Sequence, residues 1–315
     1  GHDAGYRPNG YLFLATDEGH LAQLAAARER QQAAGLTNVE LLSAADIKSL
    51  VPQLRTDDVR GGSYCPTDGL LSPLDALAGF MSRARQFGVE LWLDTQVSKI
   101  ETDGRGVAGV ETSRGRVATR AVVNAAGAWA AEVAGTAGLE LPVTPLRRQL
   151  IGVRTRETFS TRLPMVIDLT DGFHFRSLGP AGDAAGTNTL RLAWPDPDAT
   201  PGFATEFDPT FITQTLERAA RRVPCLAAVE EEPSERRAGL YEMTPDRHAI
   251  ICEAPTLPGL FLANGFSGHG VMHSPATGRA VSDLILRGGT NLFGLTPLSL
   301  ERFASGSLNE EGSLL

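Results

Sequence analysis

The stretch Gly259-Leu-Phe-Leu-Ala-Asn-Gly-Phe-Ser-Gly-His-Gly-Val-Met-His-Ser-Pro-Ala-Thr-Gly-Arg279 carries the strongest structural signal in the sequence. Its first five residues form an apolar run of strand length, and Pro275 to Leu286 is expected to be a helix. Between them, Gly265, Gly268 and Gly270 allow a ligand to approach the backbone closely. The helix would direct the positive end of its dipole at electron-rich oxygens, so we expect an anionic group at this loop.

A second stretch of the same kind is Ala121-Val-Val-Asn-Ala-Ala-Gly-Ala-Trp-Ala130. It has the pattern of a buried strand that runs through small residues into the start of a helix. In α/β folds a ligand commonly lies at the carboxyl end of such a strand. Both ends of the chain are therefore expected to be α/β, whereas the alternating runs from about Pro142 to Arg237 predict a mostly antiparallel sheet.

Shorter patterns place the other elements. Gly61 to Gly69, around Tyr64, contains several turn-forming residues and is expected to be a loop. Helices are expected at residues 18–34 and 43–51, from Ser72-Pro73 to Gly88, and from Asp208-Pro209 onward. Strands are expected at residues 11–15, 39–42, 89–93, 97–100, 107–111, 116–119, 149–153, 173–176 and 189–194.

Composition excludes several classes of protein. The 315 residues include 29 Lys and Arg against 37 Asp and Glu, a net charge of −8, so nucleic acid is not an expected partner. No apolar run approaches the roughly 18 residues of a membrane span. The three cysteines show neither a disulfide pattern nor zinc-ligand spacing, and no metal site is expected. No targeting peptide is visible at the start, which favours a cytoplasmic location.

Four motifs together resemble one family, and they occur in its order and spacing: Tyr64-Cys-Pro-Thr-Asp-Gly69, Ala121 to Trp129, Gly239-Leu-Tyr-Glu-Met-Thr-Pro-Asp246 and Gly265-Phe-Ser-Gly-His-Gly270. From about residue 5 to 304 the chain resembles the FAD-dependent D-amino-acid oxidase (DAO) superfamily, in the branch of sarcosine oxidase, dimethylglycine dehydrogenase and FAD-dependent oxidoreductase-domain proteins.

The resemblance implies a mixed α/β fold with two interleaved domains. A partial, Rossmann-like FAD-binding domain is expected at residues 66–141 and 246–305. A substrate domain with a large antiparallel sheet is expected at residues 5–65 and 142–245. The active site would lie between the two, where pockets commonly occur.

One part of the family pattern is not identified. Family members begin with a strand, a GxGxxG loop and a helix that hold the FAD pyrophosphate, and we identify no such unit in the sequence. Two explanations are open: the sequence is an N-terminally truncated piece, which we expect, or the protein cannot hold FAD in the usual way.

The resemblance also implies the residues that contact the cofactor. Gly239 stands where sarcosine oxidases have a cysteine bonded to the flavin, so FAD is expected to bind without a covalent link there. His269 either faces the flavin, which we expect, or only closes its loop. The full set of expected FAD contacts is Ala126, Gly127, Trp129, Gly265, Ser267, Gly268, His269, Gly270, Val271 and Met272.

The expected substrate contacts centre on Tyr241, which matches a tyrosine that faces the substrate carboxylate in sarcosine oxidases, although it could instead be a buried structural residue. Met272 replaces the lysine that binds that carboxylate in the family. Arg148, or its neighbour Arg147, is a candidate for the missing positive charge, the alternative being a solvated surface pair. Trp194 is expected to wall the pocket or to belong to the core.

Arg191 completes the expected catalytic set with Tyr241 and His269. It falls near a lysine that family oxidases place beside the flavin to help reduce oxygen. If its side chain faces the flavin, it supplies positive charge there; if it points the other way, it is an ordinary strand arginine.

The function implied by the resemblance is oxidation of the C–N bond of an amino acid or N-methyl amino acid by hydride transfer to FAD, in an oxidase or a dehydrogenase. The sequence contains no Ser/His/Asp triad, P-loop or HExxH motif. The alternatives are a non-catalytic flavoprotein-like scaffold or assembly factor, an inactive truncated fragment, and one part of a hetero-oligomer. The oligomeric state, homo- or hetero-oligomeric, stays open.

Overall fold

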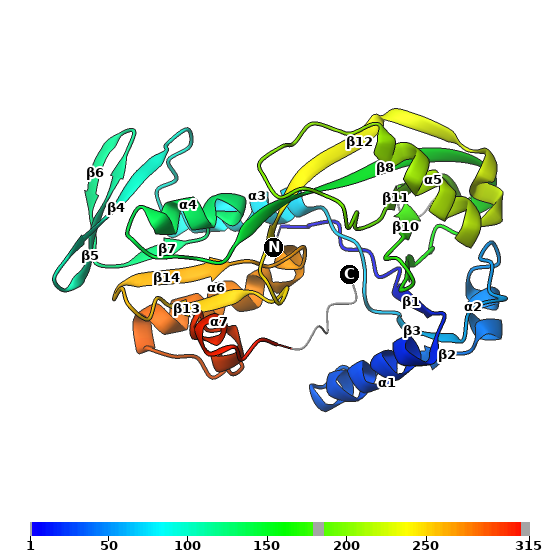
Figure 1. Cartoon of the computed structure of the whole chain (residues 1–315), viewed down its shortest axis with the longest axis horizontal. Helices are drawn as coiled ribbons and strands as arrows, with labels where there is room; N and C mark the ends of the chain where they lie inside the picture. The colour runs from blue at the N-terminus through cyan, green and yellow to red at the C-terminus, as the bar shows by residue number, and fades with distance from the viewer. Residues whose placement is uncertain (1, 179–185, 310–315) are drawn as a thin grey trace.

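The computed structural model describes residues 2–178 and 186–309, and these form two lobes of mixed α/β structure (Figure 1). The lobe at the right of the view contains an eight-stranded sheet in the order β12-β8-β11-β10-β9-β1-β3-β2. Its pairs are antiparallel except β1 with β9. The strands are β1 (Tyr11–Ala15), β2 (Glu40–Leu42), β3 (Gly61–Cys65), β8 (Thr144–Phe159), β9 (Met165–Asp168), β10 (His174–Ser177), β11 (Thr187–Ala193) and β12 (Glu230–Met243).

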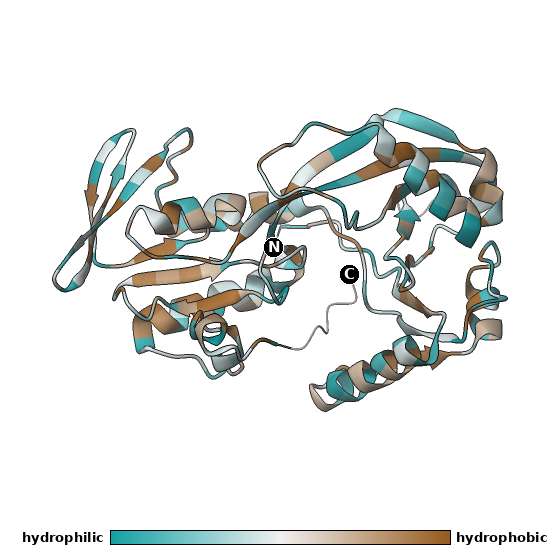
Figure 2. Ribbon diagram, in the orientation of Figure 1, coloured by the Kyte–Doolittle hydropathy of each residue, from teal (hydrophilic) through white to brown (hydrophobic). Residues whose placement is uncertain are grey.

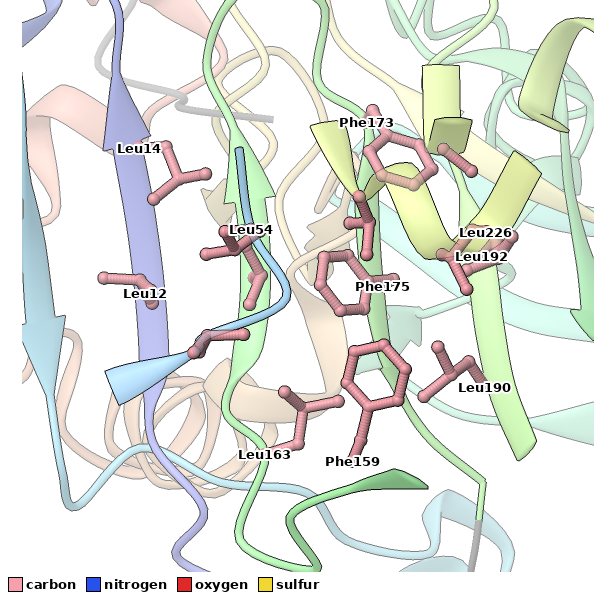
Figure 3. Close-up of a cluster of buried hydrophobic side chains, with 14 of the residues drawn as sticks. Leu12, Leu14, Leu54, Phe159, Leu163, Phe173, Phe175, Leu190, Leu192 and Leu226 are labelled. Carbon is pink, nitrogen blue, oxygen red and sulfur yellow. The ribbon is translucent and has the colours of Figure 1, made fainter. Parts of the chain in front are cut away.

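One face of this sheet carries the largest apolar core. Side chains alternate across a strand, so Leu12 and Leu14 of β1 lie on the same face as Phe175 of β10, Leu190 of β11 and their neighbours (Figure 3). Helix α5 (Thr210–Arg222) contributes Phe211 and Ala219 to this core, and α2 (Ala44–Leu50) contributes Ile47. Helix α1 (Glu18–Ala33) packs beside β1 and β3. The opposite face of the sheet does not carry this apolar core and is therefore available to form a site.

The second lobe contains the sheet β13 (Ile250–Glu253), β14 (Leu260–Asn264) and β7 (Val122–Asn124), in which β14 and β7 are parallel. Helix α6 (Gly270–Arg287) covers one face and α4 (Ala130–Gly135) the other. Strands β4 (Val97–Asp103), β5 (Gly106–Thr112) and β6 (Gly115–Ala118) form an antiparallel meander. The remaining helices are α3 (Pro73–Gln86), α7 (Glu301–Ser305) and three short 3₁₀ turns, at Gly127–Trp129, Pro224–Ala228 and Thr296–Leu298.

Hydropathy follows this division of faces. Figure 2 shows that β13, β14 and the middle of β8 are apolar, whereas most of β12 is hydrophilic.

Within residues 2–178 and 186–309, no helix is long and apolar enough to cross a membrane. In the same residues, no cluster of three or more His, Cys, Asp or Glu side chains is arranged to hold a metal ion.

Three expected elements are wrong. Residues 61–65 are strand β3 and not a loop, and residues 89–93 are exposed and do not form a strand. Helix α6 begins at Gly270, five residues before Pro275. Pro275 has no N–H to donate to the carbonyl of Val271, and the hydroxyl of Ser274 donates to that carbonyl instead, at 2.9 Å.

The string GxGxxG does occur once, as Gly104-Arg-Gly-Val-Ala-Gly109. It lies at the turn between the antiparallel strands β4 and β5 and no helix follows it, so it is not the dinucleotide-binding unit. The strands of the eight-stranded sheet come from residues 11–65 and 144–243. The expected two-domain division itself stays a prediction.

Candidate functional site

A cavity of about 520 Å³ lies between the open face of the eight-stranded sheet and the loop at residues 265–270, which we call the glycine loop. Pairing in register puts Arg148 of β8 beside Gly239 of β12, on the face opposite Ile151 and Val153. The same alternation directs Tyr11, His174 and Ala193 to the cavity. The site is thus assembled from strands that are far apart in the sequence.

Tyr241 of β12 packs against the glycine loop. A Cβ atom placed on Gly268 would lie 2.4 Å from Cε2 of the Tyr241 ring, and Gly268 has a φ of +98°. Both the close approach and the left-handed backbone therefore require glycine at residue 268. Partial burial raises the pKa of Tyr241, so the hydroxyl is protonated and can donate a hydrogen bond at neutral pH.

The replacement Gly268→Ala is expected to destabilise the protein by about 1–3 kcal/mol, because it combines backbone strain with displacement of the Tyr241 ring. Gly278→Ala on α6 is the matched control: a Cβ there meets nothing within 4 Å, and its backbone is helical. That variant should be stabilised by up to about 1 kcal/mol. Thermal unfolding of both variants tests this, and similar changes in the two would contradict the packing described.

Arg148 is the cation that lies against Tyr241. Its guanidinium carbon is 5.9 Å from the centre of the Tyr241 ring, and Nη1 donates to the carbonyl of Asp196 at 3.2 Å. Burial lowers the pKa of Arg148, but an arginine keeps its charge in proteins. The neighbouring Arg147 lies outside the cavity lining and pairs with Asp208 at 3.4 Å. Of the two candidate arginines, the structure brings only Arg148 to the cavity.

The glycine loop contributes Ser267, Gly268 and His269 to the cavity, and Met272 follows from the first turn of α6. Nδ1 of His269 lies 3.3 Å from the carbonyl oxygen of Phe266. Burial lowers the pKa of His269, so its imidazole is neutral at neutral pH. This end of the cavity therefore offers neutral polar groups and the start of a helix.

Other residues expected at the site lie elsewhere. Arg191 is not among the described residues that line the cavity, and its Nη2 pairs with Glu235 at 2.7 Å. Trp194 lines the cavity and also stacks on Phe211, with ring centres 6.1 Å apart, so it serves both pocket and core. Trp129 stacks instead on Phe203 at 5.5 Å. The lining described also does not include Ala126, Gly127, Gly265, Gly270 or Val271, whose roles stay predictions.

Sequence reasoning missed several lining residues, among them Tyr11, Met165 and His174. Tyr11 and Met165 come from β1 and β9, which pair in parallel although about 150 residues separate them. Nδ1 of His174 donates a hydrogen bond to the carbonyl of Gly172 at 2.8 Å, and burial lowers the pKa of His174. The alternation of residues along β1 and β10 was the available sequence signal. It shows which residues lie on the same face of a strand, but not which other segment of the chain packs against that face.

The fold and the cavity define a mixed α/β protein with a cavity between a mostly antiparallel sheet and a glycine loop. Residues 1–284 match the family described as DAO, FAD dependent oxidoreductase. The chain therefore belongs to the DAO family of FAD-dependent oxidoreductases.

Individual relatives agree with this assignment. The chain is 30% identical to mitochondrial sarcosine dehydrogenase of Mus musculus, over 91% of this chain but only 32% of that protein, so it spans about a third of that relative. It is 30% identical to glycine oxidase of Geobacillus kaustophilus, over 96% of this chain and 76% of that enzyme. The crystal structure of L-proline dehydrogenase from P. horikoshii superimposes with a TM-score of 0.85 at 26% identity, covering 96% of this chain and 79% of that one.

FAD is the cofactor of this family, and the residues present fit a flavin. Both amide atoms of Asn264, where β14 meets the glycine loop, are buried and have no hydrogen-bond partner within the part of the chain described. A Cβ on Gly239 would meet nothing within 4 Å, so the floor of the cavity is open there. Gly239, the glycine loop and Met272 would hold the flavin ring, and residue 239 offers no sulfur for a covalent link.

Proposed function

We propose that the protein is a FAD-dependent oxidoreductase that oxidises the C–N bond of an amino acid or an N-methyl amino acid, in the enzyme class acting on CH–NH or CH–NH₂ groups. The observation that carries the proposal is the pairing of Arg148 with Tyr241 inside a cavity that the glycine loop closes. A guanidinium and a phenol hydroxyl are the donors that bind a carboxylate well. The relatives named above support a small amino acid as substrate.

The charges around the cavity agree with a carboxylate ligand. Among the described lining residues there are three arginines, Arg148, Arg237 and Arg247, and no Asp or Glu. His174 and His269 also line it, and the pKa of each is lowered by burial, so neither adds charge at neutral pH. An anionic substrate would therefore be attracted to the cavity, and a substrate without a carboxylate would not.

In this proposal the residues of the chain act by orientation. Arg148 binds the carboxylate, Tyr241 donates a hydrogen bond to the same group, and together they fix the carbon that loses hydrogen against the floor formed by Gly239. FAD, when bound, supplies the two-electron acceptor. The apolar side chains of Leu150, Met165 and Trp194 exclude water from the substrate. The amine binds unprotonated, so no strong base is required, and water hydrolyses the imine product.

The test is product formation by the FAD-reconstituted protein with an artificial electron acceptor. Sarcosine, dimethylglycine, glycine and proline are supplied separately, and the assay follows formaldehyde, ammonia or the cyclic imine. We expect turnover of at least one of them. Methylamine and pyrrolidine, which lack the carboxylate, are the matched controls and should not turn over. Failure of every amino acid with a FAD-loaded protein would contradict the proposal.

A further inference from the structure

Hydrogen bonds join the glycine loop to the end of β12 and to Thr244, which follows it. The N–H of Ser267 donates to the carbonyl of Glu242 at 3.1 Å, and the N–H of Thr244 donates to Oγ of Ser267 at 3.3 Å. The N–H of Phe266 donates to Oε1 of the Glu242 carboxylate at 3.4 Å. Glu242 is therefore bonded to the loop through both its main chain and its side chain.

The Glu242 carboxylate lies behind the loop and not in the cavity. Tyr241 and Met243, its neighbours in β12, both line the cavity, whereas Glu242 is not among the described residues that line it. Its second oxygen, Oε2, is buried and has no hydrogen-bond partner among the residues the structure describes. Burial raises the pKa of Glu242, whereas hydrogen bonds from the N–H groups of Gly265 and Phe266 oppose this rise.

A carboxylate with one buried, unbonded oxygen is costly, and such groups call for an explanation. Hydrogen bonding to the loop alone does not need a charge, because a glutamine in the same place would accept the same N–H groups. When it is ionised, the carboxylate also places negative charge beside the loop that faces the cavity. A negative charge there disfavours any further negative charge that gathers on the cavity side.

We propose that Glu242 is a positioning residue that fixes the glycine loop and, by its charge, makes the bound flavin harder to reduce. This inference rests on the proposed function, because it assumes that the electron acceptor lies against the loop. The inference assigns a role to Glu242, which is not among the described residues that line the cavity.

The reduction potential of the bound flavin tests the charge directly. We expect Glu242→Gln to favour reduction at least tenfold in the equilibrium constant, which is about 30 mV for a two-electron couple. Glu242→Asp keeps the charge and should stay closer to the original potential than Glu242→Gln does. Glu230→Gln removes an exposed charge from the far end of β12 and is the control, with an expected change of less than twofold. Equal shifts in Glu242→Gln and Glu230→Gln would overturn the charge effect.

Hydrogen exchange of the protein without added FAD tests the positioning. Glu242→Ala should accelerate exchange at Gly265 and Phe266, whereas Glu242→Gln should leave these amides protected. Unchanged exchange in Glu242→Ala would overturn the positioning role.

The reduction potential of the flavin is measured by titration with a chemical reductant, without any amino acid. If the potential shifts in Glu242→Gln but the protein oxidises no amino acid, the proposed role of Glu242 is supported and the proposed function is contradicted. If the protein oxidises an amino acid but the potential does not shift, the proposed function is supported and the charge effect of Glu242 is contradicted.

Discussion

Replacement of Arg148 by glutamine is expected to lower kcat/KM for an amino-acid substrate about 100-fold. A hydrogen bond to a charged group contributes roughly 1.5–3 kcal/mol, and each 1.36 kcal/mol corresponds to a tenfold change in rate. Arg148 lies in the cavity against Tyr241, so the substrate carboxylate would lose its nearest cation there. Steady-state kinetics of the FAD-loaded variant measure the loss, which should appear mainly in KM if binding is uniform.

The control for this prediction is Arg147→Gln. Arg147 is the adjacent residue of β8, but it pairs with Asp208 and with the carbonyl of Glu206 away from the cavity. Its replacement should change kcat/KM less than twofold. Equal losses in the two variants would show that Arg148 acts through the stability of β8 and not through the carboxylate.

Replacement of Arg222 by methionine is expected to destabilise the protein by about 3–5 kcal/mol. The Arg222 side chain is 2% exposed, and its Nε donates to Asp168, itself 1% exposed, at 2.7 Å. The same guanidinium donates to Asp58 and to the carbonyl of Arg55. Its removal leaves the buried Asp168 carboxylate without its cation, although the N–H of Thr170 still donates to Oδ1 of Asp168 at 3.0 Å. Thermal unfolding should show a fall of roughly 10 °C in Tm.

Two further variants separate loss of charge pairing from loss of packing. Arg221→Met removes the neighbouring arginine, which is 48% exposed and pairs with Asp171, and should cost at most about 1 kcal/mol. The double variant Arg222→Met with Asp168→Asn should recover part of the stability, because no buried charge remains unpaired. No recovery in the double variant would mean that shape, and not charge, is what Arg222 supplies.

The sequence predicted the glycine loop, the strand before it and the presence of a helix after it, though not that helix's start at Gly270, because glycine spacing and apolar periodicity are local signals. It could not predict why Gly61 and Gly62 are glycines. They resemble a turn, yet they lie in β3, where a Cβ on Gly62 would be 2.4 Å from the carbonyl oxygen of Phe13. The reason is close packing against a strand some 50 residues earlier, which no local pattern contains.

The candidate site shows the same limit. Tyr241 and Arg148 could be proposed from motif and charge, but their contact depends on the register of β8 with β12. Arg191 lies on the same face of β11 as Ala193, which does line the cavity, but Arg191 itself is not among the described lining residues. Its ion pair with Glu235 comes from a separate strand and was not visible in the sequence. The sequence showed which residue types were present, but not which residues on neighbouring strands they contact.

The most direct test of the account is the visible absorption spectrum of the FAD-loaded protein, recorded without oxygen before and after addition of an amino acid. We predict that the flavin bands bleach with at least one of sarcosine, dimethylglycine, glycine and proline, and that Arg148→Gln slows this bleaching about 100-fold at low substrate concentration. Flavin bands that stay unchanged with every amino acid, while a chemical reductant bleaches them, would contradict the proposed activity.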